Sequence, residues 1–205
     1  MSALPNRDRR AERREATRRE IVDAAWDIAG DDGLENVTLR AVAERVGMRS
    51  PSLYTHFESK NAIYDAMFGQ AWSDYLATIE DLDGELPAAP RKALLFMLMT
   101  FVDFATANLP RFQLMNQRVV ADFTPTEASY APSVRVMDLF RERMRTIGIP
   151  RAEDVDLCAA LVGGLVDAQF ANDPGGNRYL KQLPRVLDMF ADDIGLPGPT
   201  LRRIR

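Results

Sequence analysis

The chain has 205 residues, of which 46% are hydrophobic and 27% charged, a composition typical of one large globular domain or two small ones. The formal net charge of −4 argues against a uniformly basic nucleic-acid coat protein but leaves room for a local basic patch. The single cysteine, Cys158, excludes an internal disulfide, and its apolar neighbours predict a buried, inert thiol. No apolar run approaches the roughly 20 residues of a membrane span, and no apolar segment follows the arginine-rich start. We therefore expect a soluble, cytoplasmic protein without a membrane partner.

Few residues in the sequence suit catalysis or metal binding. There is one histidine, His56, and there is no clustered Cys/His spacing, phosphate-binding loop or dinucleotide fingerprint. Ser52 lies four residues before His56, but no orienting acid or oxyanion loop is near them in the sequence. The acidic run of residues 153–156 stands where negative charge complements a helix dipole, which explains it better than a metal site. We expect no enzyme activity, no catalytic residues, no metal and no cofactor.

The amino-terminal part predicts an arm followed by a first helix. Residues 1–16 combine five arginines with acidic residues and lack apolar periodicity, so we expect a flexible Arg-rich arm. Thr17 and Glu20 form a capping box that predicts the start of the helix. Apolar residues then recur at helical spacing until Gly30–Gly33 ends the pattern.

Two short helices joined by a tight turn are predicted next. Thr38 is the expected N-cap of the first, and Gly47 supplies the positive φ of the turn. Ser50 and Pro51 predict the N-cap and first position of the second. Leu53 and Phe57 form its inward face, four residues apart.

A longer helix capped by Ser59 follows and extends to about Ile79. Together, the helices over residues 17–62 describe a helix-turn-helix unit. The outward face of the second short helix is polar and not acidic, which suits a major groove about 12 Å wide. A surface helix that is merely solvated has the same pattern. Four cations against Glu44 and Glu58 between residues 37 and 60 provide the charge for phosphate contacts.

The stretch from Thr38 to Lys60 resembles the DNA-binding domain of TetR-family transcriptional repressors. The cap threonine, the Val-Ala pair, the turn glycine and the Leu-Tyr, His-Phe and Ser-Lys pairs have the order and spacing of that family. The resemblance covers about residues 17–68. It implies an all-α fold, with an N-terminal three-helix helix-turn-helix DNA-binding domain and a C-terminal helical ligand-binding and dimerisation domain.

The resemblance also implies roles for single residues at the DNA. Arg49, Ser50 and Ser52 would face base edges, and Tyr54 and His56 would hydrogen-bond phosphates. Thr38 and Lys60 would each contact a phosphate, and Arg40 would reach the groove or the backbone. The predicted DNA-binding residues are Thr38, Arg40, Arg49, Ser50, Ser52, Tyr54, His56 and Lys60. Met48, Arg49 and the Asn61–Ala62 pair depart from the family pattern, and Arg49 could donate two hydrogen bonds to a guanine. The arm could enter the adjacent minor groove or remain a solvated tail.

Residues 63–194 are expected to form the regulatory and dimerisation domain. Helices are predicted over 91–108, 111–121 and 133–147, the first so apolar that it should be buried on nearly all sides. Methionines and phenylalanines are frequent here, which suits either a cavity for an irregular apolar ligand or an ordinary core. The candidate ligand-pocket residues are Phe101, Phe104, Phe112, Met115, Asn116, Met137, Phe140 and Gln169.

The last two helices are expected to form the dimer interface. One begins after Pro150 and continues to Phe170, and Gly163–Gly164 within it suggests close approach by another helix. Pro184 delays or kinks the final helix, which ends near Ile194. The candidate interface residues are Leu161, Gly163, Gly164, Leu165, Leu183, Leu187 and Phe190, and residues 195–205 are expected to be a flexible tail.

Together these observations predict a homodimeric repressor that binds an inverted-repeat double-stranded DNA operator and dissociates when a small apolar or amphipathic effector binds. Two alternatives remain at this stage. One is a ligand-independent DNA-binding regulator whose apolar half is solid core. The other is a helical small-molecule carrier with an inactive DNA-reading head.

Overall fold

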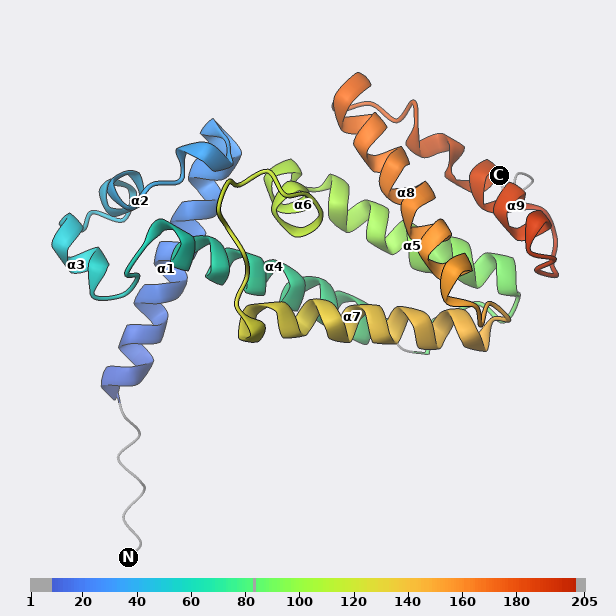
Figure 1. Cartoon of the computed structure of the whole chain (residues 1–205), viewed down its shortest axis with the longest axis horizontal. Helices are drawn as coiled ribbons and strands as arrows, with labels where there is room; N and C mark the ends of the chain where they lie inside the picture. Colours follow the sequence, from blue (N-terminus) through green and yellow to red (C-terminus); the bar gives the residue numbers. More distant parts are fainter. Residues whose placement is uncertain (1–8, 83, 202–205) are drawn as a thin grey trace, which may run out of the picture. The chain divides into compact units, whose positions relative to one another are not determined.

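The computed structural model describes residues 9–82 and 84–201, and every regular element in these ranges is a helix (Figure 1). This confirms the all-α fold class. The helices are α1 Arg9–Asp32, η1 Leu34–Asn36, α2 Leu39–Arg45, α3 Ser50–Tyr54, α4 Lys60–Asp81, α5 Pro90–Thr106, α6 Leu109–Asn116, α7 Glu127–Thr146, α8 Ala152–Asn172, η2 Leu180–Gln182 and α9 Leu183–Asp193. Among these described residues, no single helix has the length and apolarity to cross a membrane, and only the bent pair α5 and α6 meets both conditions when counted together.

The chain forms two compact units that differ from the predicted division at residue 62. Unit 1 comprises Met1–Ala71 and Pro110–Tyr130, and unit 2 comprises Trp72–Leu109 and Ala131–Arg205. The segment after α6 joins unit 1 because it packs along α4. There, Asn61 donates its side-chain N–H to the carbonyl of Asp122 at 3.0 Å, and the Tyr64 and Phe123 rings lie 5.8 Å apart.

Helix α1 begins at Arg9, eight residues before the predicted start at Thr17. The expected arm is therefore helical over residues 9–16, and its remainder, residues 1–8, lies outside the described residues. Alanine, glutamate and arginine are good helix formers, and Glu15 stands four residues before Arg19, an order that stabilises a helix. The core of unit 1 forms where the apolar face of α1 meets η1 and α2, and it includes Ile21, Ala25, Ile28, Val42, Leu53, Phe57, Ile63 and Tyr64.

Two helix boundaries in the middle of the chain also differ from the prediction. Helix α6 ends at Asn116, five residues before the predicted end. Helix α7 begins at Glu127, six residues before the predicted start at residue 133, and contains Pro132. A tertiary contact explains this early start. The Asp65 carboxylate accepts hydrogen bonds from the backbone N–H and hydroxyl of Thr126 at 2.7 and 2.9 Å and from the Ser129 hydroxyl, and it thereby caps α7.

Unit 2 is built on the mutual packing of α5, α8 and α9. Helix α5 is buried along one side, but Leu95 and Phe96 are only half-buried and Met99 is exposed, so the expected burial on nearly all sides is wrong for this chain alone. Helix α9 starts late, with Pro184 in its first turn, as predicted. Cys158 is fully buried, and this burial raises the pKa of its thiol to about 12.

The carboxyl-terminal segment is docked onto unit 2 up to residue 201, which corrects the expected flexible tail over 195–205. Leu196 and Leu201 are buried. Arg91 donates to the carbonyl of Leu196 at 2.9 Å, and the buried Asp188 carboxylate accepts the backbone N–H of Leu201 at 2.9 Å. The sequence could not place these partners, because they lie 105 and 13 residues apart. Residues 202–205 are outside the described residues.

Candidate nucleic-acid interface

The first half of the candidate site is α2 and the turn after it. The Thr38 hydroxyl oxygen accepts the backbone N–H of Ala41 at 3.1 Å, which confirms the predicted N-cap. Gly47 has φ 68°, a left-handed conformation that glycine adopts without the cost of a Cβ clash. The turn closes when the Met48 N–H donates to the carbonyl of Ala43 at 2.8 Å. Thr38 and Arg40 are both exposed, so their side chains remain accessible to a ligand.

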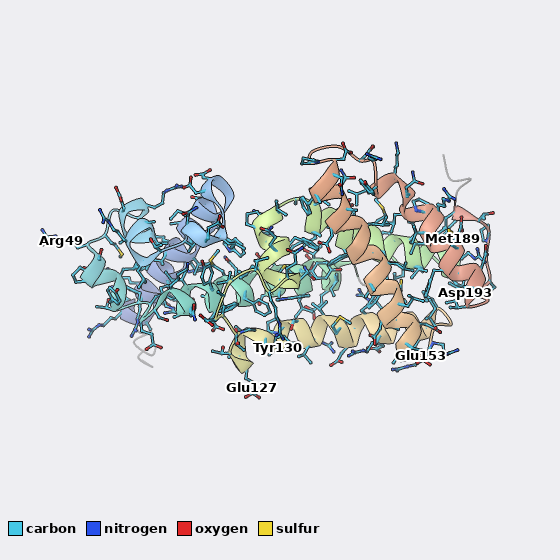
Figure 2. The ribbon with its side chains drawn as sticks, turned by 45° about the horizontal axis from the view of Figure 1, so that its top comes forward. Arg49, Glu127, Tyr130, Glu153, Met189 and Asp193 are labelled. Carbon is cyan, nitrogen blue, oxygen red and sulfur yellow. The ribbon has the colours of Figure 1, made fainter. Side chains whose placement is uncertain are left out.

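The second half is α3, a helix of five residues. Its N-cap is Arg49, one residue before the predicted Ser50, and Pro51 occupies its first turn as expected. Leu53 and Phe57 are both buried as predicted, although Phe57 lies three residues after the end of α3. The opposite face is polar and exposed through Arg49, Ser50, Ser52 and Tyr54, and Figure 2 shows Arg49 extending outward from the start of α3. His56 is only half-buried, and its Nδ1 atom is buried without a hydrogen-bond partner.

The cationic side chains around α2 and α3 differ in the contacts that they make within the protein. Arg45 pairs with Asp31 at 3.2 Å. Lys60, a predicted phosphate contact, donates to the carbonyl of Glu35 at 3.2 Å, and its Nζ lies 5.1 Å from the centre of the Tyr64 ring. An exposed hydrogen bond to a neutral carbonyl is weak enough for a phosphate to replace it. Arg40 and Arg49 are exposed at the outer surface of the two helices.

Two functional candidates that the sequence reasoning missed lie on α1. Arg14 donates to the carbonyl of Thr55 at 3.2 Å, and Arg18 donates to the carbonyl of His56. Both carbonyls follow the end of α3. The signal was present in the spacing, because positions 14 and 18 continue the stripe of 21, 25 and 28 that forms the core face of α1. The helix start expected at Thr17 left Arg14 outside the helix.

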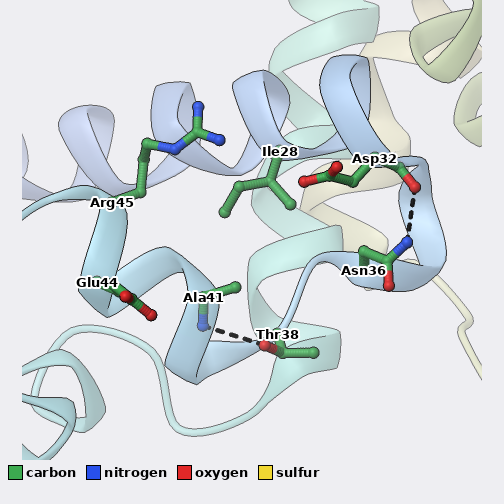
Figure 3. A pocket seen from close by; sticks show the side chains of 7 residues that line it. All are labelled: Ile28, Asp32, Asn36, Thr38, Ala41, Glu44 and Arg45. Atoms are coloured by element: carbon green, nitrogen blue, oxygen red, sulfur yellow. Dashed lines mark hydrogen bonds between the residues drawn. The ribbon is translucent and has the colours of Figure 1, made fainter.

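A hollow of about 840 Å³ lies beside α2, lined by Ile28, Asp32, Asn36, Thr38, Ala41, Glu44 and Arg45. Figure 3 shows its two internal hydrogen bonds, from Ala41 to Thr38 and from Asn36 to the carbonyl of Asp32. The side chains of Asp32 and Glu44 give it an acidic wall. It differs in place and in chemistry from the apolar effector cavity expected from the sequence.

The candidate ligand-pocket residues are divided between the two units. Phe112 and Met115 are buried in unit 1, and the exposed Asn116 donates to the carbonyl of Phe112 in its own helix at 3.1 Å. In unit 2, the Tyr75 ring lies 5.8 Å from Phe101 and 4.9 Å from Phe104. Burial raises the pKa of the Tyr75 hydroxyl, and the nearby Arg143 lowers it by less. Met137 and Phe140 are half-buried on α7.

Gln169 has a structural role in place of the expected ligand-orienting one. It is buried, its amide N–H donates to the backbone and side chain of Asp173, and its oxygen accepts the backbone N–H of Tyr179 at 2.9 Å. The backbone N–H of Arg178, and then Gln169, hold the pKa of the Asp173 carboxyl below its usual range. These contacts fix the turn that follows α8.

The predicted dimer-interface residues also separate into two groups. Leu183, Leu187 and Phe190 are buried within unit 2, where α9 packs on α5 and α8, and this corrects their assignment to the interface. On α8, Gly164 is exposed and Leu161, Gly163 and Leu165 are half-buried. Apart from the adjoining residues and the backbone of α8 itself, no atom of the described chain would lie within 4 Å of a Cβ built on either glycine. The close helix neighbour expected there is therefore not supplied by the described residues.

Comparisons with known proteins identify the domain that contains this interface. Residues 21–67 match the model of the bacterial regulatory proteins of the tetR family. A tetracycline repressor protein of class C from Escherichia coli is 40% identical over 50 residues, which are 24% of this chain and 23% of that protein. Residues 21–67 therefore form a DNA-binding domain of the tetR family type. Because the matched part is about a quarter of these curated relatives, the family assignment rests on the DNA-binding domain.

Solved structures extend the likeness of the fold to most of this chain. A protein of unknown function from Rhodococcus sp. RHA1 has a TM-score of 0.73 and 19% identity, covering 88% of this chain and 95% of that one. The Bacillus subtilis regulator FadR, solved in complex with stearoyl-CoA, has a TM-score of 0.66 and 12% identity, covering 84% and 96%. TetR-family regulators are generally non-enzymatic, DNA-binding repressors that often respond to ligands.

Proposed function

We propose that the chain is a cytoplasmic, homodimeric transcriptional repressor that binds an inverted-repeat operator through α2 and α3 and leaves it when an apolar or amphipathic effector binds. The observation that carries the proposal is the division of α3 into two faces. Leu53 and Phe57 anchor it in the core, while Arg49, Ser50, Ser52 and Tyr54 stand exposed. That arrangement presents hydrogen-bond donors to base edges and phosphates.

Thr38, Arg40, His56 and Lys60 complete the proposed contact surface. Thr38 and Arg40 are exposed, and His56 and Lys60 are half-buried. Hydroxyl, imidazole and cationic groups before and after α3 suit phosphate oxygens, which fix the register of a protein on the duplex. Arg49 is the residue proposed to read a base, because its guanidinium can donate two parallel hydrogen bonds to the O6 and N7 atoms of a guanine.

The proposed dimer face runs along α8 and includes one residue of α9. Leu157 and Met189 are 46% and 58% exposed, which is unusual for side chains of this size. Leu157, Leu161, Gly164 and Ala168 recur at helical spacing, so they form one stripe. The open space at Gly164 would let a partner helix approach closely. Figure 2 marks Met189 on α9.

The proposed effector site uses the aromatic cluster of unit 2. Phe101 and Phe104 pack on Tyr75 but remain half-buried, so part of each ring is available to an apolar ligand. The fold's likeness to FadR, which was solved with stearoyl-CoA, supports a long apolar ligand as the first class to test. To move the protein from almost fully DNA-competent to almost fully incompetent, such a ligand must discriminate between the two states by about 5.5 kcal/mol.

The test of the proposal is a selection of bound duplexes from a random DNA library at near-physiological salt, followed by sequencing. We expect an enriched inverted repeat whose half-sites are about 34–36 Å apart, or a multiple of that spacing. Release of the selected duplex is then measured against long-chain acyl-CoA and fatty-acid probes. Salt-sensitive binding without any enriched sequence would contradict the repressor and favour the carrier. Enrichment without release by any probe would favour the ligand-independent regulator.

The dimer is tested separately with Leu157→Glu and Met189→Glu combined in one chain. We expect the variant to sediment as a monomer, because each partner would bury two unpaired carboxylates. Val134→Glu is the matched control, since Val134 is also 46% exposed but lies on α7. If the double variant and the control both sediment as dimers, the proposed face is wrong.

A further inference from the structure

The orientation of α3 depends on contacts outside the helix itself. A helix of five residues is far below the length at which helices are stable alone. Leu53 anchors its inner side, and Phe57, three residues beyond its end, anchors the turn that follows, so these two contacts form a single row about which the helix could still tilt. Arg49 caps its start without a side-chain hydrogen bond. Beyond its packing on α2, a contact near its carboxyl end would help to define the tilt.

Arg18 supplies that contact. Its guanidinium donates to the carbonyl of His56, and its Cζ atom lies 4.1 Å from the centre of the Phe57 ring. The ring is buried, so the cation–π contact is formed over a fixed surface. The carbonyls beyond a helix end carry partial negative charge and lack intrahelical partners, which makes a cation a favourable neighbour.

Arg14 makes a parallel contact one turn earlier on α1. It donates to the carbonyl of Thr55 at 3.2 Å and is more exposed than Arg18. Both arginines belong to a helix of 24 residues whose core face is packed from Ile21 onward. Helix α1 thus holds the end of α3 at two successive carbonyls, on the inward side of the proposed contact surface.

We propose that Arg18, assisted by Arg14, is a positioning residue that sets the angle at which α3 meets the bases and thereby contributes to operator discrimination without touching DNA. This inference rests on the proposed function. Its consequence differs from that of a phosphate contact. Loss of a phosphate contact weakens binding to every sequence and lowers the salt slope by about one unit. Loss of a positioning contact weakens binding to the operator alone.

The experiment compares Arg18→Met with Arg19→Met, using the selected operator and a scrambled duplex of equal length. Arg19 is the matched control, because it is the neighbouring arginine, is exposed, and gives the same change in charge. We expect Arg18→Met to lose tenfold or more in affinity for the operator, with a change of less than threefold on the scrambled duplex and an unchanged salt slope. Arg18→Lys, which keeps a donor and a cation, should recover most of the loss.

Hydrogen exchange provides a readout without DNA. The N–H groups of Leu53 and Phe57 bond to the carbonyls of Arg49 and Leu53, and we expect them to exchange faster in Arg18→Met than in Arg19→Met. If Arg18→Met fails to fold, Arg14→Met carries the test, with an expected loss of two- to fivefold on the operator alone. The inference would be overturned if the Arg18 and Arg19 variants had equal affinities for both duplexes and equal hydrogen-exchange rates. An equal loss on both duplexes would overturn it in favour of a phosphate contact. A wild-type protein that does not prefer the operator would instead overturn the proposed function, and this inference with it.

Discussion

Arg18 in unit 1 and Arg91 in unit 2 both fasten a segment of chain through a backbone carbonyl, but with different partners. Arg18 is half-buried, and its partners are neutral: the carbonyl of His56 and the ring of Phe57. Arg91 is buried, donates to the carbonyl of Leu196, and faces the fully buried Asp188 carboxylate at 3.5 Å and Asp192 at 2.7 Å. Removing Arg91 leaves a buried charge behind, whereas removing Arg18 leaves none. The comparison teaches that Arg91 is chiefly a stability residue, and that Arg18 can affect geometry with little effect on folding.

The largest expected effect is that of Arg91→Met. The variant leaves Asp188 buried with one cationic partner fewer, so we expect a loss of about 3–5 kcal/mol in the free energy of unfolding. Urea unfolding followed by circular dichroism measures it. Lys92→Met, at the exposed neighbouring position, is the control and should change stability by no more than about 0.5 kcal/mol. Equal unfolding midpoints for Arg91→Met and Lys92→Met would contradict the view that Arg91, unlike Arg18, acts chiefly on stability.

Asp65→Ala is expected to have the next largest effect. The Asp65 carboxylate accepts three hydrogen bonds from Thr126 and Ser129 at the start of α7. When the carboxylate is removed, these three donor groups remain partly accessible to water. We expect a loss of about 2–3 kcal/mol. Glu80→Ala, at an exposed position of the same helix, serves as the reference. A loss no larger than that of Glu80→Ala would mean that the early start of α7 does not depend on Asp65.

Arg18→Met should cost only about 1–2 kcal/mol, because it removes one hydrogen bond and one partly exposed cation–π contact. The same urea titration measures this value beside that of Arg91→Met. The comparison holds if Arg18→Met lies well below Arg91→Met in unfolding free energy while having the larger effect on operator affinity. The reverse order in stability would contradict it.

The reactivity of the Cys158 thiol tests the burial of this face of α8 without any substitution. Burial raises the pKa of its thiol to about 12, so the reactive thiolate is scarce in the folded protein at pH 8. The shift adds stability that is fully present below the ordinary thiol pKa near 9 and is lost as the pH rises toward 12. We expect iodoacetamide to react slowly with the native protein at pH 8 and rapidly in 8 M urea. Equal rates would show that this face of α8 opens readily.

Local sequence was sufficient where a helix end depends on neighbouring residues. The Thr38 cap, the Gly47 turn, the inward pair Leu53 and Phe57, and the Ser59 cap are all decided within a few positions. The proposed contact surface lies in the same stretch, which is why most of its residues could be selected from the sequence.

Sequence reasoning was wrong where distant contacts decide the outcome. At the early start of α7, the Thr126 hydroxyl accepts the Ser129 N–H locally, but Asp65, 61 residues before Thr126, also holds both residues in place. The carboxyl-terminal segment is docked because Arg91 reaches Leu196. The stripe of Leu183, Leu187 and Phe190 faces its own chain, since α5 and α8 cover it, and the periodicity of a helix does not tell which neighbour lies against it.

The most direct test of the account is to run the duplex selection in parallel for the wild-type protein and Arg49→Ala. The account predicts an inverted repeat for the wild type and, for the variant, the same repeat with the preference lost at one guanine in each half-site, a change of about 1–3 kcal/mol at that position. A wild-type selection without an inverted repeat, or identical preferences in both selections, would contradict the claim that Arg49 at the start of α3 reads the operator.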